Sequence, residues 1–425
     1  MSFFSRRSSK YILSRLNEFN IRISENQSQL RSPEIQSLTT SDFQTKQDHQ
    51  DYADIQTNTI ENLITCVITS GELGFMEAYI DGKWSSHDLV KLFEKLLITN
   101  IDKDVKSWKD AFQHMLNKCV NYQTIEQSKQ VIDIHYNISN TFYRDMLGPT
   151  MQYSCAYWQP GEQNEASKSP EEISGERSRA WKTCLTLDEA QEQKMELIAQ
   201  KLKLTSKSRV LDIGCGFGTL AKYLSESCSE VVGCTLSEEQ YLYACETFSD
   251  SIKSGKLRFI LCDYRNLPEN IGVFDRIVSV GFLEHVGVKN LPQFASICNK
   301  HLIDTNGILL IHTIGKENKS NETSAFIRKY IFPGGELPTP QNVLSSFGPH
   351  FRLEDWHNFG KDYAKTLKAW QSNFMKSRFK NEKQNRIWEL YLSSTQAAFS
   401  VRKIQLYQIV FTKKRDMQIE YVSVR

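Results

Sequence analysis

The chain has 425 residues, of which 40% are hydrophobic and 24% are charged. This is the composition of a globular protein, and the length allows more than one domain. The 52 basic and 50 acidic side chains give a formal net charge of +2. A balance so close to neutral excludes the strong positive field by which proteins attract nucleic acid, so we expect no nucleic-acid partner.

The ten cysteines are scattered along the chain, and no two of them form a C-x-x-C pair. Two of them, Cys215 and Cys262, lie inside apolar segments. Both features argue against a secreted disulfide framework and against a zinc site. We therefore expect a reducing environment and no bound metal.

Residues 1–55 are predicted to form a polar, flexible extension, because residues 23–55 are rich in Ser, Gln, Asn, Thr and Asp and have few large apolar groups. The first segment, residues 2–16, has no acidic residue and carries positive charges at Arg6, Arg7, Lys10 and Arg15. Three alternatives fit it: an organelle transit peptide, a helix on a membrane surface, or a solvated arm. No run in the chain approaches the roughly 18–20 apolar residues that cross a bilayer, so a lipid would be reached from the surface.

Two folded domains are predicted after the extension. Residues 56–128 form a small helical domain, since apolar positions recur at helical spacing. Residues 129–425 form an α/β domain with a mostly parallel sheet flanked by helices, because helical stretches alternate with short apolar runs. The predicted strands are Arg209–Ile213, Glu230–Thr235, Leu257–Cys262, Asp275–Val280 and Gly307–Thr313. The predicted helices include Thr219–Ser225, Ser237–Phe248 and Leu291–Leu302.

The first of these strands runs into a glycine-rich turn with glycines at alternate positions, Gly214, Gly216 and Gly218. A Cβ at Gly214 or Gly216 would push a ligand away, and the turn itself needs backbone angles that favour glycine. A nucleotide-like cofactor is expected at the carboxyl end of such a strand. The turn therefore predicts a Rossmann-like fold with a cofactor bound beside it.

The spacing favours S-adenosylmethionine (AdoMet) over a dinucleotide, because Thr219 stands where G-x-G-x-x-G would place its last glycine. Asp212, just before the turn, can hold an ammonium group or a water. The second strand ends without the acidic residue that usually binds the ribose, so Thr235 and Gln240 are predicted to supply polar contacts there. Asp263, after the third strand, is predicted to contact the adenine amine.

Several further motifs resemble those of the cyclopropane-fatty-acid synthase family, from about Gly71 to the end of the chain. The motifs, as they stand in this sequence, are residues 73–82 (LGFMEAYIDG), 135–137 (HYN), 151–158 (MQYSCAYW), 283–287 (LEHVG), 312–315 (HTIG), 329–334 (KYIFPG), 354–360 (EDWHNFG) and 404–406 (IQL). Two departures are Thr395, where the bacterial synthases carry a second cysteine, and a polar insert between Trp158 and Leu187.

The resemblance implies an AdoMet-dependent methyltransferase that methylates a cis double bond in a phospholipid acyl chain and closes a cyclopropane ring after a proton is lost. In the family the base is a bound bicarbonate, and its contacts carry over to Cys155, Glu284, His312, the backbone of Ile314, and Tyr363. Tyr153 and Ser154 carry over as contacts of the cofactor's amino acid end. The implied partner is unsaturated phospholipid, met by a cytoplasmic enzyme at the inner face of a membrane. A homodimer and organelle targeting by the basic N-terminus stay open.

Three other functions also stay open. A methyl- or methylene-branching acyl methyltransferase keeps the fold and the lipid but makes no ring. A small-amine N-methyltransferase methylates nitrogen, so it has no need of the set formed by Glu284, His312 and Tyr363. A catalytically silent lipid-binding protein would not need the glycine turn.

Overall fold

The computed structural model describes residues 3–18, 20–25, 54–99, 139–158, 186–317, 324–415 and 420–425. The chain divides into two compact units, which we call the helical unit and the sheet unit. The helical unit comprises Met1–Val120, Ser324–Phe326 and Phe379–Val401, and the sheet unit comprises Asn121–Thr323, Ile327–Arg378 and Arg402–Arg425. The motif at residues 135–137 and the insert at 159–185 lie outside the described residues.

The helical unit combines four helices with a three-stranded sheet in the order β1-β2-β3, as far as its described residues go. Its elements are α1 (Phe3–Glu18), β1 (Ile23–Glu25), β2 (Ile55–Thr57), α2 (Ile60–Ile80), β3 (Trp84–Ser85), α3 (Leu89–Thr99) and α16 (Glu382–Ser400). Helix α16 packs against α3 and α2, and the Tyr79 hydroxyl donates a hydrogen bond to Glu389 at 2.9 Å.

This division differs from the predicted boundaries at both ends of the chain. The predicted extension contributes α1 and β1 to the helical unit, where Ile12, Leu16 and Ile21 are buried. Ile12 and Leu16 are four residues apart and so share one face of the helix. Helix α16, which carries Thr395, belongs by its contacts to the helical unit and not to the domain predicted for residues 129–425.

Helix α2 corrects the expectation that no segment is long enough to cross a bilayer. Its 21 residues include a window of mean hydropathy 1.3, which satisfies length and composition criteria for a span. The helix is kinked at Ser70 and Gly71, whose backbone angles are not helical, and 44% of the window is buried inside the protein. The core helix of a folded domain meets the same criteria, so they give only weak support for a span.

The sheet unit contains a seven-stranded sheet in the order β6-β5-β4-β7-β8-β10-β9. The strands are β4 (Arg209–Ile213), β5 (Glu230–Thr235), β6 (Leu257–Leu261), β7 (Arg276–Val280), β8 (Ile308–Gly315), β9 (Phe351–Asn358) and β10 (Gln405–Lys413). The first five pair in parallel, and β10 runs antiparallel to both β8 and β9. This order confirms the predicted α/β fold with its mostly parallel sheet.

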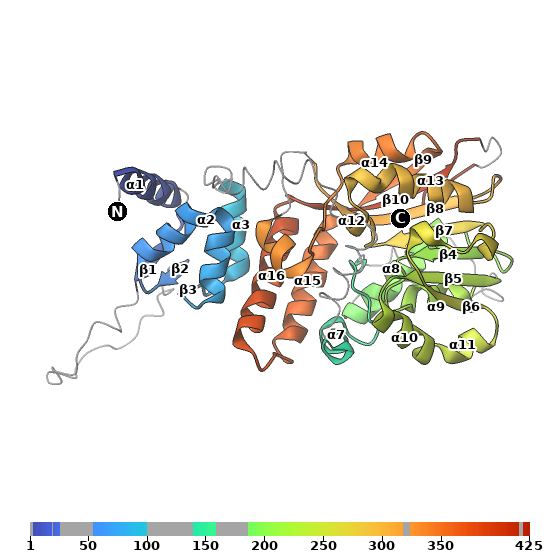
Figure 1. Cartoon of the computed structure of the whole chain (residues 1–425), viewed down its shortest axis with the longest axis horizontal. Coiled ribbons are helices and arrows are strands. Elements are labelled where there is room, and N and C mark those ends of the chain that lie inside the picture. The colour runs from blue at the N-terminus through green and yellow to red at the C-terminus, as the bar shows by residue number, and fades with distance from the viewer. Residues whose placement is uncertain are drawn as a thin grey trace, which may run out of the picture. The chain divides into compact units, whose positions relative to one another are not determined.

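Helices cover both faces of this sheet (Figure 1). Alternate residues of a strand point to opposite faces, and Leu211 and Val210 accordingly belong to different core clusters. One cluster joins the sheet to α13 (Leu291–His301) and α14 (Pro340–Phe347), and the other joins it to α8 (Leu187–Lys201) and α9 (Thr219–Ser225). The remaining described α-helices of the unit are α7 (Asn140–Leu147), α10 (Glu238–Thr247), α11 (Ser249–Lys253), α12 (Leu283–Val286) and α15 (Gly360–Phe374).

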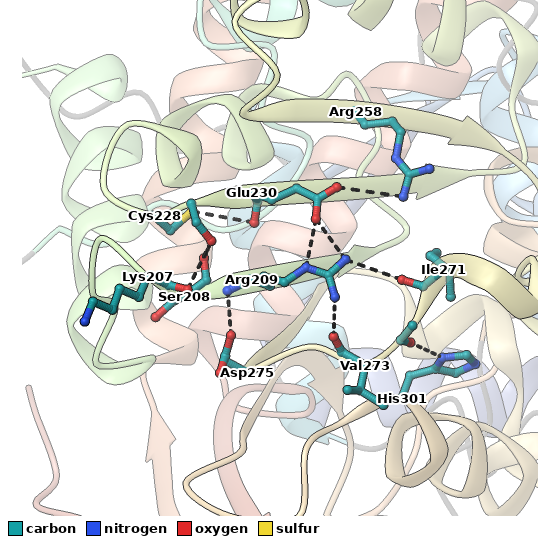
Figure 2. Close-up of polar contacts among 12 residues, drawn as sticks. Lys207, Ser208, Arg209, Cys228, Glu230, Arg258, Ile271, Val273, Asp275 and His301 are labelled. Atoms are coloured by element: carbon teal, nitrogen blue, oxygen red, sulfur yellow. Dashed lines mark hydrogen bonds and ion pairs between the residues drawn. The ribbon is translucent and has the colours of Figure 1, made fainter.

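The edge at which the parallel strands begin, which we call the amino edge, carries a network of paired charges (Figure 2). The Arg209 guanidinium donates hydrogen bonds to Glu230 at 2.8 Å and to the Val273 carbonyl at 2.6 Å. The Arg209 backbone N–H donates to the Asp275 carboxylate at 2.7 Å, and Arg258 lies 3.8 Å from Glu230. These contacts tie the starts of four adjacent strands together.

Candidate functional site

The opposite edge, which we call the carboxyl edge, contains the topological switch point of the sheet. Strand β4 lies between β5 and β7, and the chain leaves β4 toward β5 and β6 before it returns to β7 and β8. In open α/β sheets, ligands bind in the crevice at this point. The residues predicted from the glycine turn and the motifs gather at this edge, since Asp212, Thr235, Asp263, Glu284 and His312 each lie near the end of a different parallel strand.

The glycine turn after β4 has left-handed backbone angles, with φ of 79° at Gly214 and 55° at Gly216. A Cβ on Gly214 would come within 2.4 Å of the Phe282 ring, so packing inside the protein already requires this glycine. A Cβ on Gly216 would meet no described atom within 4 Å. Gly216 therefore borders open space, as a turn that cradles a cofactor requires. At Gly218 the obstacle is again packing, against Phe259 at 2.7 Å.

Asp212 is 1% exposed at the end of β4. Within the described part of the chain, its Oδ2 atom has no hydrogen-bond partner. Burial raises the pKa of Asp212 to about 7, and the charge of Lys194 opposes the rise. A buried carboxylate without a partner is costly, and an ammonium group is a suitable partner. The residue is therefore suited to either of its predicted partners, an ammonium group or a water, and its contact with AdoMet stays a prediction.

The predicted ribose and adenine contacts lie nearby but already have protein partners. The Thr235 hydroxyl donates to Gln240 Oε1 at 3.1 Å, which places these two side chains together. Asp263 accepts hydrogen bonds from the Arg265 guanidinium at 2.7 and 2.6 Å, one on each carboxylate oxygen. Contacts of these three residues with the cofactor stay predictions.

Tyr153, Ser154 and Cys155 lie in the segment Met151–Trp158, which we call the 151–158 segment. Two side chains of α8 hold it. Lys194 donates to Gln152 Oε1 and, at 2.7 Å, to Ser154 Oγ. Gln191 donates to the backbone carbonyl of Ser154 at 2.9 Å. Neither α8 residue was among the predicted site residues.

Glu284, in α12, is 8% exposed. The Ile314 backbone N–H donates to Glu284 Oε1 at 2.5 Å, while Oε2 lacks a partner among the described residues. Burial raises the pKa of Glu284 to about 7, so the carboxyl group can hold or release a proton near neutral pH. The structure thus brings Glu284 and Ile314 together through this hydrogen bond, and a contact of either residue with bicarbonate stays a prediction.

His312, in β8, is 1% exposed. Both of its ring nitrogens lack a partner in the described ranges. Burial, followed by the charges of Lys194 and Lys201, lowers the pKa of His312 well below its ordinary value. The imidazole is therefore neutral, with one nitrogen able to donate and the other able to accept.

Cys155 and Tyr363 complete the predicted set. Cys155 is fully buried, and burial, followed by the charge of Asp362, raises its pKa well above the ordinary value, so it is a neutral thiol. Tyr363 is 7% exposed on α15. Its ring packs edge-on against Trp370 with 5.9 Å between ring centres, and Trp370 packs against Tyr153 at 5.3 Å. Aromatic packing thus connects Tyr363 to the 151–158 segment.

Residues 123–409 match the family model described as mycolic acid cyclopropane synthetase. The chain is 36% identical over 357 residues to the cyclopropane-fatty-acyl-phospholipid synthase of Escherichia coli strain K12, an alignment that covers 82% of this chain and 85% of the relative. It is also 28% identical over 381 residues to a probable fatty acid methyltransferase of Mycobacterium tuberculosis, covering 81% of this chain and 83% of the relative.

Solved structures agree with these relatives. The cyclopropane synthase MmaA2 of Mycobacterium tuberculosis superimposes with a TM-score of 0.56 at 27% identity, covering 67% of this chain and 98% of its own. The mycolic acid cyclopropane synthase CmaA1, solved with S-adenosylhomocysteine (AdoHcy) bound, gives a TM-score of 0.54 at 28% identity and covers 67% of this chain and 98% of its own. The chain belongs to the mycolic acid cyclopropane synthetase family and is an AdoMet-dependent methyltransferase.

Proposed function

We propose that this enzyme transfers the methyl group of AdoMet to the cis double bond of an unsaturated acyl chain in membrane phospholipid and closes a cyclopropane ring. The family supports cyclopropanation of a lipid, and the 36% identity to a phospholipid synthase supports this substrate class. The observation that carries the proposal is the pair of buried groups, Glu284 and His312, that have free hydrogen-bonding atoms among the described residues. A methyl transfer that needs no proton removal would not require them.

When bound, AdoMet supplies an electrophilic methyl group. An alkene is a weak nucleophile, so the protein must hold the double bond close to this methyl group in a site without water. Gly216 leaves space for the cofactor beside the turn, and Asp212 offers a carboxylate for its ammonium group. Because Cys155 is held as a neutral thiol, it does not compete with the alkene as a thiolate would.

Methylation of an alkene gives a cation, and ring closure requires that a proton leave the transferred methyl group. We propose bicarbonate as the base, held by His312, Glu284, Cys155 and Tyr363. The neutral imidazole of His312 can donate one hydrogen bond to the anion. Glu284, whose pKa burial raises to about 7, can share a proton with it, and this shared proton prevents repulsion between two anions. The Ile314 N–H would reach the anion only by sharing its hydrogen bond with Glu284.

The acyl chain must reach the site through apolar surroundings. Phe332, which follows the π-helical turn Ile327–Ile331, packs against Tyr153 with 6.1 Å between ring centres and against His285 at 5.7 Å. We propose that this aromatic cluster lines the path of the acyl chain. We further propose that the enzyme is cytoplasmic and acts at the inner face of a membrane, and salt-sensitive binding to anionic vesicles would test this.

The second candidate is a fatty acyl methyltransferase that makes a methyl- or methylene-branched chain, as a relative named a probable fatty acid methyltransferase suggests. Both functions share the cofactor, the lipid and the cation. They differ in which proton leaves. A small-amine N-methyltransferase and a silent lipid-binding protein are less well supported, because neither needs the buried Glu284 and His312.

Expression in a host that lacks the activity tests the proposal. Mass alone cannot distinguish cyclopropane, methyl-alkene and methylene-branched chains, because they share one elemental composition. Proton NMR can, since the ring methylene is strongly shielded. We expect that signal in the purified phospholipid. If the phospholipid contains branched chains and the ring-methylene signal is absent, the second candidate function is correct and cyclopropanation is not.

A further inference from the structure

Helix α8 buries a lysine beside the cofactor site. Lys194 is fully buried, which is rare for a lysine. The residue lies four positions after Ala190 and four before Ile198, both of which are also fully buried. This spacing places Lys194 on the inward face of the helix. Its amino group therefore lies inside the protein, where it needs polar partners.

The hydrogen bonds of Lys194 are directed at the 151–158 segment. Its Nζ atom donates to Gln152 Oε1 and to Ser154 Oγ, the second at 2.7 Å. Gln191, three residues earlier on the same helix, donates to the backbone carbonyls of Gln152 at 3.3 Å and Ser154 at 2.9 Å. The backbone and side chain of Ser154 are thus both fixed from α8.

The contact with Lys194 determines which role the Ser154 hydroxyl can play. An ammonium group has only donors, so Ser154 Oγ must be the acceptor in this hydrogen bond. Its own hydrogen then remains available for another acceptor. Ser154 is 6% exposed and has no further side-chain partner within the described ranges. The hydroxyl is therefore a prepared donor for a ligand acceptor such as a carboxylate.

Asp212 supplies the opposite charge at the same site. Burial lowers the pKa of Lys194 to about 7 and raises that of Asp212 to about 7, and the charge of each residue opposes the shift of the other. The Oδ2 atom of Asp212 has no partner among the residues described. The site thus offers a hydroxyl donor supported by a cation and, separately, a free carboxylate oxygen. The amino acid end of AdoMet is a zwitterion with a carboxylate and an ammonium group, which is the complementary arrangement.

We propose that Lys194 is a positioning residue for AdoMet that orients the Ser154 hydroxyl toward the cofactor's carboxylate, while Asp212 receives its ammonium group. This inference rests on the AdoMet binding in the proposed function and is independent of whether the product is a ring. The alternative is a purely structural role, in which Lys194 only holds the 151–158 segment in place. That role would affect every ligand of the site equally.

The test compares two ligands by calorimetry on the full chain. AdoHcy carries the amino acid end, whereas 5′-methylthioadenosine has the same nucleoside thioether without it. We expect Lys194→Met to weaken AdoHcy by roughly ten- to a hundredfold, the usual size of a lost hydrogen bond to a charged group, and to leave 5′-methylthioadenosine unchanged. An equal loss for both ligands, or no loss for AdoHcy, would overturn the proposal.

Lys201→Met is the matched control. Lys201 is also fully buried on α8, seven residues further on, but it pairs with Asp355 at 3.2 Å and not with the 151–158 segment. We expect this variant to bind both ligands as the wild type does, while its thermal unfolding temperature falls. If Lys201→Met selectively weakened AdoHcy, the effect would be one of charge burial in general and the proposal would fail.

Ser154→Ala provides a second route should Lys194→Met not fold. It removes the hydroxyl and leaves the lysine, and we expect the same selective loss of AdoHcy affinity. Combining both changes should add little further loss, because they act through one hydrogen bond. Fully additive losses would contradict the linkage. If the variants lose AdoHcy affinity selectively, as expected, but the lipid products are branched, only the assignment of a ring product is overturned. If the wild type binds neither AdoHcy nor 5′-methylthioadenosine, both the role of Lys194 and the proposed function are overturned.

Discussion

At the amino edge of the sheet, the Arg209 guanidinium donates to Glu230 and to the Val273 carbonyl, and the Arg209 backbone N–H donates to Asp275 (Figure 2). At the carboxyl edge of the same strands, Asp212 and Glu284 each keep an oxygen without a partner within the described ranges. The two edges belong to one seven-stranded sheet. Their difference is in how completely buried polar atoms are satisfied.

The difference has a physical cost that identifies the working edge. A buried polar atom without a partner costs about 1–3 kcal/mol. Burial raises the pKa of both Asp212 and Glu284 to about 7, which shows how poorly the carboxyl edge accommodates charge. The amino edge stabilises the fold, whereas the carboxyl edge gives up stability in order to meet a ligand. Matched substitutions at the two edges can break or sharpen this contrast.

The largest expected effect is that of replacing His312, with a second buried histidine as the control. His312→Gln should lower the rate of methyl transfer by about 10²–10⁴, the usual loss when acid–base assistance disappears, and leave AdoMet affinity nearly intact. His301 is the control at the amino edge, 6% exposed, with Nδ1 3.1 Å from the Gly272 carbonyl. His301→Gln should keep the wild-type rate. Equal rates for the two variants in a labelled-methyl assay would contradict the contrast.

Two glycines allow the cofactor site to be tested separately from backbone strain. Gly216 and Gly255 both have positive φ, of 55° and 76°, and a Cβ on either would meet no described atom within 4 Å. Gly216→Val should weaken AdoMet by at least about a hundredfold, because the side chain enters the cofactor's space. Gly255→Val, in the loop leading into β6, should have a similar effect on stability without loss of affinity. Calorimetry on both folded variants measures their AdoMet affinity. Equal affinities for the two variants would contradict the assignment of the cofactor site to the turn at Gly216.

The pH dependence of stability reports on Glu284. Its folded pKa of about 7 lies above the ordinary 4.5, so the folded state holds the proton more tightly than the unfolded chain. The resulting stabilisation is fully present below about pH 4.5 and is lost as pH rises through about 7. Relative to wild type, Glu284→Gln should gain up to roughly 3 kcal/mol in free energy of unfolding over that range. Urea unfolding without ligand would show a pH-independent difference if Glu284 were not a buried acid.

The smallest effect is expected from Glu230→Gln at the amino edge. The pair with Arg209 is part exposed, with side chains 37% and 27% accessible, and solvent screens such pairs. We expect the free energy of unfolding to fall by less than about 1 kcal/mol and AdoMet affinity to stay unchanged. A loss of affinity would show that the amino edge also influences the cofactor site.

Much of the sheet unit could be predicted from the sequence, because short apolar strands alternate regularly with crossover helices. The predicted Arg209–Ile213, Glu230–Thr235 and Thr219–Ser225 agree with β4, β5 and α9 at both ends. The grouping of α16 with the helical unit could not be predicted, since it depends on contacts between segments some three hundred residues apart.

The site shows a similar limit. The motif residues were predicted from resemblance, but Lys194 was missed because lysine normally marks a solvent-facing position. The sequence did contain a signal for its burial. On α8, Lys194 and Lys201 follow the buried Ala190 and Ile198 by four and three residues, so all four lie on one helix face. Two other contacts could not be predicted. Glu284 accepts a hydrogen bond from the Ile314 N–H, and Arg265 donates to both oxygens of Asp263. Both contacts depend on side-chain geometry that no sequence pattern encodes.

One substitution made at both edges tests the central claim most directly. Glu284→Gln and Glu230→Gln each replace a carboxylate by an amide of the same shape, and the assay is transfer of labelled methyl from AdoMet to unsaturated phospholipid vesicles with AdoMet affinity measured alongside. We predict that Glu284→Gln loses about 10²–10⁴ in rate while binding AdoMet almost normally, and that Glu230→Gln keeps the wild-type rate. A Glu284→Gln variant as active as Glu230→Gln would show that the unpartnered carboxyl group does not serve the reaction.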